Sequence, residues 1–160
     1  MLGRRLLVIG DGPDRARLMI NAGPTISFLG LLSDAAVQHH AARCRALIFP
    51  GEEDFGMAPL EVAAAGRPTI AYRAGGAVET IVDGVTGVFF DRQDASSLAE
   101  AIQRFERQEW SAKALRSHAE RFGIDVFQSR FRQFLAKVGA PLPEFTPVSF
   151  VTPAAIPRAG

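Results

Sequence analysis

The sequence predicts a Rossmann-like α/β fold, in which a parallel β-sheet is flanked by helices. Three observations support this prediction. Short apolar runs recur along the chain, each too brief for a helix and bounded by Gly, Pro or Asp. Helix-forming stretches separate these runs, as crossover connections between parallel strands require. The 160 residues are 48% hydrophobic, which is enough to bury one core and matches the length of one domain.

Five apolar runs are predicted to be strands. They are rich in Leu, Ile, Val and Phe, a composition typical of strands that are buried on both faces of a sheet. In chain order they are Leu6–Ile9, Thr25–Leu29, Ala46–Phe49, Thr69–Tyr72 and Val88–Phe90.

Helices are predicted between and after these strands. Ser33-Asp34 is a typical N-terminal cap, whereas Gly66-Arg67-Pro68 and Asp83-Gly84 are typical helix stops. The predicted helices cover residues 14–21, 34–44, 57–65, 76–82, 94–109, 111–121 and 125–138. In the last of them, Phe127, Phe131, Phe134 and Leu135 recur at helical spacing, so we expect this stripe to pack on a core.

The C-terminal segment has a different composition. Five of the ten prolines lie in the last twenty residues, which favours extended or disordered backbone. The predicted organisation is one domain over residues 1–138, followed by a Pro-rich, disordered tail over residues 139–160.

Composition excludes several classes of function. The net charge is +1, so no general electrostatic field favours nucleic acid or an anionic membrane. The single Cys44 cannot form an internal disulfide, and no N-terminal secretion signal is evident, which favours a reducing, cytoplasmic setting. No apolar run is long enough to span a bilayer.

Loops that follow the strands are the candidate binding sites, because ligands of open parallel sheets bind beyond the carboxyl ends of the strands. The first such loop is Gly10-Asp11-Gly12-Pro13, whose glycines permit close approach of a ligand to the backbone. A simple tight turn explains the same residues equally well.

The third strand-to-helix loop is more specific. Glu52, Glu53 and Asp54 are adjacent, and their charges repel unless they are solvated or held by a ligand. Gly56 opens the backbone where a helix begins, so free N–H groups near Gly56, Met57 and Ala58 can donate to a diphosphate. Carboxylates nearby can accept hydrogen bonds from sugar hydroxyls. The loop therefore suits recognition of hydroxyl and phosphate groups together.

A family resemblance covers residues 6 to 138. Glu53 and Glu61 form an E-x7-E pattern within the longer run E-x-F-G-x-x-x-L-E-x-x-A-x-G-x-P. A second glycine loop at Gly75-Gly76 and a G-x-x-G turn at Gly84 to Gly87 follow in order. The chain thus resembles the donor-binding, C-terminal half of a GT-B glycosyltransferase of the retaining, metal-independent family 4, or group 1, type.

The resemblance implies a role for each matched residue. Glu61 is expected to bind the ribose hydroxyls and Glu53 to contact the donor sugar, as the catalytic residue of the set. The backbone of Phe55, Gly56 and Met57 is expected to meet the sugar and the pyrophosphate. The Gly30-Leu31-Leu32 segment would pass the nucleobase, and Gly10 and Gly12 would lie near the phosphates. The ligand is a nucleoside-diphosphate sugar, with no cofactor and no metal.

Two parts of the family pattern are not matched. The N-terminal, acceptor-binding domain has no counterpart, so we expect no sugar transfer by these residues alone and membrane association only through that half. The first strand of the donor domain is also missing before Leu6. We therefore predict a truncated chain, a partner chain that supplies the strand, or direct pairing of Leu6–Ile9 with Ala46–Phe49, since unpaired buried backbone groups are costly.

Alternatives remain open for individual residues. Glu61 could be a solvated acid favoured by the helix dipole. His39-His40 is expected to lie on a polar helix face rather than bind zinc, and Cys44 to be a small apolar residue. Arg73 could face a phosphate or lie on the surface.

Two rival functions are open for the whole chain. One is a non-catalytic nucleotide-sugar-binding module that works with a separate partner chain. The other is a related GT-B enzyme such as a sugar-nucleotide epimerase. A dinucleotide dehydrogenase is disfavoured because no G-x-G-x-x-G follows the first strand.

Overall fold

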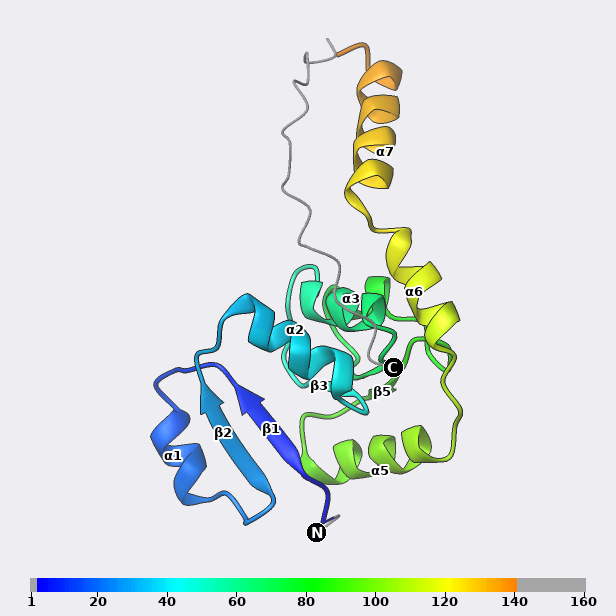
Figure 1. Cartoon of the computed structure of the whole chain (residues 1–160). Helices are drawn as coiled ribbons and strands as arrows, with labels where there is room; N and C mark the ends of the chain where they lie inside the picture. Colours follow the sequence, from blue (N-terminus) through cyan, green and yellow to red (C-terminus); the bar gives the residue numbers. More distant parts are fainter. Residues whose placement is uncertain (1–2, 141–160) are drawn as a thin grey trace, which may run out of the picture. The chain divides into compact units, whose positions relative to one another are not determined.

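The computed structural model describes residues 3–140 (Figure 1). The chain divides after Gly123 into two units, the second of which begins at Ile124. The strands are β1 (Leu6–Ile9), β2 (Ile26–Gly30), β3 (Leu47–Phe49), β4 (Thr69–Tyr72) and β5 (Gly87–Phe90). The helices are α1 (Arg15–Ile20), α2 (Asp34–Arg43), α3 (Met57–Ala64), α4 (Ala77–Thr80), α5 (Ala95–Glu106), α6 (Ala112–Glu120) and α7 (Ile124–Lys137).

All five strands pair in parallel, which confirms the predicted α/β class, but they form two sheets rather than one. β1 pairs with β2, and β4 lies between β3 and β5. Direct pairing of β1 with β3 was one of our three expectations, and it is wrong for the described residues. Among residues 3–140, each of these two strands has one edge without a strand partner.

A carboxylate, not a backbone ladder, joins the starts of β1 and β3. Arg4, just before β1, donates to Glu106 at 2.7 Å, and Arg45, just before β3, donates to the same oxygen at 3.3 Å. The side chains of this cluster link the two chain segments, which are therefore separated by the length of these side chains. A ladder requires strands to lie about 4.8 Å apart, so this arrangement does not form one.

The three-stranded sheet carries the core on both of its faces. One face contributes Phe49, Ala71 and Phe89, which pack with Ala77 of α4 and with Ile81. The opposite face contributes Ile70, Val88 and Phe90, which pack with Ala101 and Phe105 of α5. The alternation follows from the two-residue period of a strand. Helices thus cover both faces of this sheet, as the sequence predicted.

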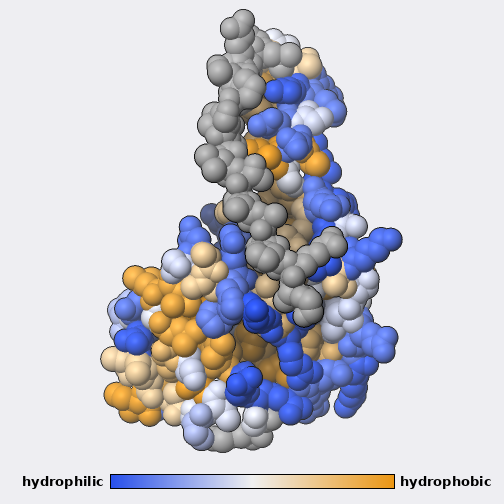
Figure 2. All heavy atoms as spheres, viewed as in Figure 1, coloured by the Kyte–Doolittle hydropathy of each residue, from blue (hydrophilic) through white to orange (hydrophobic). Residues whose placement is uncertain are grey.

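The β1–α1–β2 segment is much more open. Of residues 3–48 none is fully buried, and Leu7, Leu18, Met19 and Ile20 are exposed. Figure 2 shows apolar side chains gathered over this part of the molecule. Little apolar area is removed from water here, so local stability is expected to be low.

We therefore expect backbone amides of β1 and β2 to exchange with solvent much faster than those of β4 and β5. Neither β1 nor β2 contains a fully buried side chain, whereas β4 is the central strand of its sheet and is mostly buried. Hydrogen exchange followed by mass spectrometry measures the difference. Equal protection in the two sheets would contradict this reading.

Side-chain caps begin three helices where the sequence placed them. The side chains of Ser33, Asp94 and Ser111 accept from the backbone N–H of Ala36, Ser97 and Ala114, respectively, and so start α2, α5 and α6.

Asp94 gives this capping a pH dependence. Its carboxylate accepts from the N–H of Ser97 at 2.7 Å and from Arg92 at 2.9 Å, and these bonds lower the pKa of Asp94 below its usual value. Because its pKa is lower in the folded state, the Asp94 carboxylate adds stability at pH values above the unfolded-state pKa of about 3.9. This stability is lost as the pH falls through the folded-state pKa.

We expect Asp94→Ala to lower the melting temperature at pH 7, with a deficit that shrinks as pH falls below about 4. Asp94→Asn, which keeps an acceptor oxygen at the cap, is the control and should retain more stability than the alanine variant. Thermal melts across pH measure both. A deficit that is constant with pH would exclude the charged cap as its cause.

The second unit contains α7. The predicted helix is confirmed, but no residue of α7 is buried, so the prediction that its aromatic stripe packs on a core is wrong for the described residues. Phe127 and Phe131 stack on each other with ring centroids 5.8 Å apart. The helical spacing defines an apolar face but does not specify what covers it. The predicted tail from residue 141 onward lies outside the described residues.

Among residues 3–140, no helix combines the length and the apolar composition that crossing a membrane requires.

Candidate functional site

The loop after β3 is shaped by one glycine. The strand ends at Phe49, and the chain turns at Gly56 with φ +79° and ψ +62° before α3 begins at Met57. This left-handed conformation is strained for residues with a side chain, so glycine is required here. Gly56 itself is buried, whereas the neighbouring Phe55 and Met57 are 50% and 62% exposed.

The first turn of α3 has free donors. No side chain caps the helix at Gly56, and the first turn carries no acidic residue. The amides of Met57 and Ala58 are therefore open to an external acceptor, and the helix dipole adds positive potential. An anion such as a phosphate fits this position.

Two carboxylates flank this turn. Glu53 and Glu61 are exposed, and within residues 3–140 the carboxylate of neither takes part in a hydrogen bond or ion pair. Glu52 and Asp54 are also exposed, as expected for acids that are solvated. Glu53 and Glu61 thus keep all their acceptor positions for a ligand rich in hydroxyl groups.

A cavity of about 510 Å³ adjoins Glu61. It lies between α3 and α6, which pack against each other, and it is mostly apolar. Its walls are Phe55, Met57, Leu60, Glu61, Ala64, Arg116, Ala119, Glu120, Phe122 and Gly123. The rings of Phe55 and Phe122 meet edge to face with centroids 6.4 Å apart. The sequence did not indicate that α6 contributes to this wall.

The second glycine loop lies directly against the Glu53 loop. Gly76 donates its N–H to the carbonyl of Glu53 at 2.7 Å. A Cβ atom at Gly75 would lie 2.4 Å from the Glu53 carbonyl oxygen, and one at Gly76 would lie 2.4 Å from the backbone of Phe55. Only glycine allows this approach, so the two loops form one structural element.

The loops of the two-stranded sheet meet each other as well. Gly10 follows β1 and donates its N–H to the carbonyl of Gly30, at the end of β2, over 2.8 Å. Cβ atoms added at Gly10, Gly12 or Gly30 would meet nothing within 4 Å, so this backbone is open to a ligand. Leu31 is 79% exposed.

The predicted site residues thus form two groups. Glu53, Phe55, Gly56, Met57, Ala58 and Glu61 belong to the three-stranded sheet, and Gly10, Gly12, Gly30 and Leu31 to the two-stranded one. Within the described residues, no hydrogen bond joins one group to the other.

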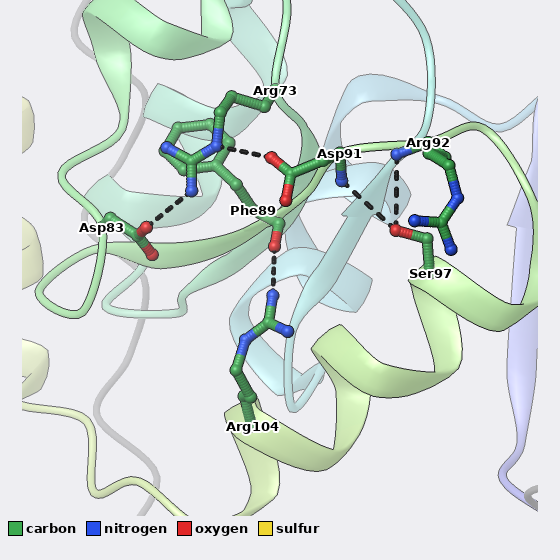
Figure 3. A network of polar contacts seen from close by, with 7 residues as sticks. All are labelled: Arg73, Asp83, Phe89, Asp91, Arg92, Ser97 and Arg104. Carbon is green, nitrogen blue, oxygen red and sulfur yellow. Dashed lines mark hydrogen bonds and ion pairs between the residues drawn. The ribbon is translucent and has the colours of Figure 1, made fainter.

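Arg73 is held by carboxylates. Figure 3 shows its guanidinium between Asp83 and Asp91, each at 2.8 Å, and its charge lies 4.4 Å from the ring centroid of Phe89. The hydrogen bond to Asp83 and that to Asp91 raise the pKa of Arg73. The structure favours the reading of Arg73 as a surface residue that ties β4 to β5, rather than a phosphate ligand.

The other candidates have structural roles. No group of His, Cys, Asp and Glu among residues 3–140 could hold a metal ion, and the His39 ring contacts Arg43 on the exposed face of α2. Burial raises the pKa of the Cys44 thiol, so it stays protonated and is a poor nucleophile. Its Sγ donates to the Ala41 carbonyl at 3.2 Å.

Two buried polar residues behind the site carried no recognisable sequence signal. Thr80 is 2% exposed and His118 is 8% exposed, and they are joined by a hydrogen bond of 2.8 Å between His118 Nε2 and the Thr80 carbonyl. They are 38 residues apart in sequence, so only the packing of α6 reveals their contact.

Comparison with known proteins gives the family. The family model "Glycosyl transferases group 1" matches residues 3–108. The chain is 34% identical, over 85% of its length, to the GDP-mannose-dependent α-(1-6)-phosphatidylinositol dimannoside mannosyltransferase of Mycobacterium tuberculosis, and it covers 36% of that protein.

Solved structures share the fold. A lipopolysaccharide outer core galactosyltransferase, WaaB, in its apo form matches with a TM-score of 0.73 at 19% identity, over 84% of this chain and 41% of that one. Anabaena Alr3699/HepE in complex with UDP-glucose matches with a TM-score of 0.62 at 20% identity, over 83% of this chain and 41% of that one. The chain thus spans less than half the length of each of these proteins.

The matched residues 3–108 contain both candidate carboxylates, the Gly56 turn and the glycine loop that packs on it. The solved galactosyltransferase WaaB matches 84% of this chain in fold. This chain belongs to the group 1 glycosyltransferase family, and its fold is that of the GT-B glycosyltransferases.

Proposed function

We propose that this chain binds the nucleoside-diphosphate sugar that donates the sugar in a retaining glycosyl transfer. The observation that carries the proposal is the Gly56 turn, where uncapped amides of α3 adjoin two exposed carboxylates that have no protein partner among residues 3–140. A diphosphate needs donors and a sugar needs acceptors, and this turn supplies both within one short segment.

Each residue takes one part of the ligand. Glu61 accepts from the ribose hydroxyls, and the amides of Met57 and Ala58 donate to the diphosphate at the N-terminus of α3. Glu53 contacts the donor sugar. Gly10 and Gly12 lie near the phosphates, and the segment at Gly30-Leu31 passes the nucleobase.

The proposed chemistry needs no metal and no cofactor. The bond between the anomeric carbon and the diphosphate oxygen breaks, the acceptor hydroxyl oxygen forms a bond on the same face of the sugar, and the departing diphosphate takes the proton of that hydroxyl. Positioning of the donor and stabilisation of the departing diphosphate by the α3 amides lower the barrier. These residues form one wall of the site, so we propose that an N-terminal GT-B domain or a partner chain binds the acceptor. We also propose that the reaction takes place in the cytoplasm.

Two donors have support from similar proteins. The mycobacterial relative is GDP-mannose-dependent, and the Anabaena structure contains UDP-glucose. The experiment is therefore a thermal-shift panel of GDP, GDP-mannose, UDP, UDP-glucose, ADP and ADP-glucose, because a ligand that binds only the folded chain raises its melting temperature. We expect one nucleotide series to stabilise the chain. If no member of the panel shifts the melting temperature at millimolar concentration, the proposal is wrong.

A second candidate is a non-catalytic nucleotide-sugar-binding module that works with a separate partner chain. The edges of β1 and β3 favour it, because they have no strand partner in the described part of the chain and an extended segment of another chain can pair there. Sugar transfer by the full chain without a partner would exclude this candidate.

A further inference from the structure

Gly76 connects the proposed donor site to the protein interior. Its N–H donates to the Glu53 carbonyl at 2.7 Å. Its carbonyl oxygen accepts from the Thr80 hydroxyl and from the Thr80 N–H, both at 3.0 Å. A displacement of the Gly76 backbone is therefore expected to move the backbone of Glu53, the residue proposed to contact the donor sugar.

Thr80 in turn is fixed by His118. The Thr80 carbonyl accepts from His118 Nε2 at 2.8 Å in a buried setting. A carbonyl oxygen can only accept, so Nε2 carries the proton in this contact. The relay runs from His118 through Thr80 and Gly76 to Glu53, from helix α6 to the loop after β3.

His118 reaches the same loop by a second route. Its ring packs on Phe122 with centroids 5.3 Å apart, and Phe122 packs on Phe55 at 6.4 Å. Phe55 precedes the Gly56 turn. A Cβ atom at Gly56 would lie 3.4 Å from the Thr80 hydroxyl, so Thr80 also supports this turn from behind.

We propose that His118 is a positioning residue for the donor site: through Thr80 and Gly76 it sets the place of the Glu53 carbonyl, and through Phe122 it sets the place of Phe55. The inference rests on the proposed donor-binding function. A leucine could fill the same volume in α6, but it would leave the buried Thr80 carbonyl without its donor. The hydrogen bond is therefore the larger of the two contributions that His118 makes to the donor site.

The test compares three variants of the full chain. His118→Leu removes the hydrogen bond at similar volume, and His118→Gln keeps an N–H donor in reach of Thr80. Phe105→Leu is the control for lost stability, because Phe105 lies in the core on the opposite face of the three-stranded sheet. Affinity for GDP-mannose and UDP-glucose is measured by calorimetry at a temperature where all variants are folded.

For the probe that binds, we expect His118→Leu to raise the Kd by about 10-fold to 100-fold, since misplacement of a site residue by about 1 Å can cost up to about 100-fold. We expect His118→Gln to restore most of the affinity and Phe105→Leu to leave it unchanged. Equal affinity of His118→Leu and the wild type, or an equal loss in Phe105→Leu, overturns the proposal.

Amide exchange, measured by NMR without ligand, separates this inference from the proposed function. The Gly76 amide should exchange faster in His118→Leu than in the wild type, with the β4 amides of Ile70 and Ala71 as reference. Unchanged protection of Gly76 overturns the relay whatever the chain binds. If the Gly76 amide exchanges faster in His118→Leu but the wild type binds neither probe, the relay exists. In that case the proposed function is wrong, and the positioning role is wrong with it.

Discussion

Glu61→Ala is expected to weaken binding of the nucleoside diphosphate by about 10-fold or more, since hydrogen bonds to a charged group are each worth about 1.5–3 kcal/mol. The reason is that Glu61 is exposed at the edge of the cavity beside α3 and has no protein partner among the described residues, so its carboxylate is available to the ribose. Isothermal calorimetry with the best ligand of the panel measures the loss.

Two variants serve as controls for the Glu61 result. Asp54→Ala removes the same charge from an exposed position in the loop that precedes α3 and should leave the affinity unchanged. Glu61→Gln keeps one acceptor oxygen and should lose less than the alanine variant. An unchanged Kd for Glu61→Ala would contradict the ribose-binding role and would support the alternative, that Glu61 is a solvated acid on α3.

Gly76→Ala is expected to have the largest effect on the fold of the site. The added Cβ would lie 2.4 Å from the Cα, C and O atoms of Phe55, and backbone atoms cannot move aside as a flexible side chain can. We expect a loss of about 3 kcal/mol or more in the free energy of unfolding, at the upper end of what overpacking costs, together with loss of nucleotide binding. Urea denaturation measures the first and calorimetry the second.

Gly12→Ala is the matched control for Gly76→Ala. A Cβ at Gly12 meets nothing within 4 Å, so the substitution should change stability by no more than about 1 kcal/mol. If Gly76→Ala were as stable as Gly12→Ala, the two loops could not be packed as described.

The local parts of the fold were predictable from the sequence. β1 and β4 have the predicted bounds, the predicted cap at Ser33 starts α2, and Asp94 and Ser111 cap helices that were predicted to begin at these residues. These features depend on side-chain periodicity and on hydrogen bonds between residues three positions apart, so a single sequence contains them. The turn at Gly56 was equally predictable, because glycine permits backbone conformations that other residues rarely adopt.

The long-range contacts were not predictable. Glu106 bridges Arg4 and Arg45 across 102 and 61 residues, and no periodicity connects three exposed charges. His118 and Thr80 meet only because α6 packs on α3. The division into two sheets has the same origin, since an apolar run predicts a strand but not the strand beside it. The roles of Glu53 and Glu61 stay predictions, because no ligand contact tests them.

The most direct test of the nucleotide site is an NMR titration of the ¹⁵N-labelled chain with the nucleoside diphosphate that the thermal-shift panel selects. We predict that the amides of Gly56, Met57 and Ala58 show the largest shifts, because the proposed donors to the diphosphate, Met57 and Ala58, lie at the start of α3. Saturation of binding with these three amides unmoved would contradict the proposed site.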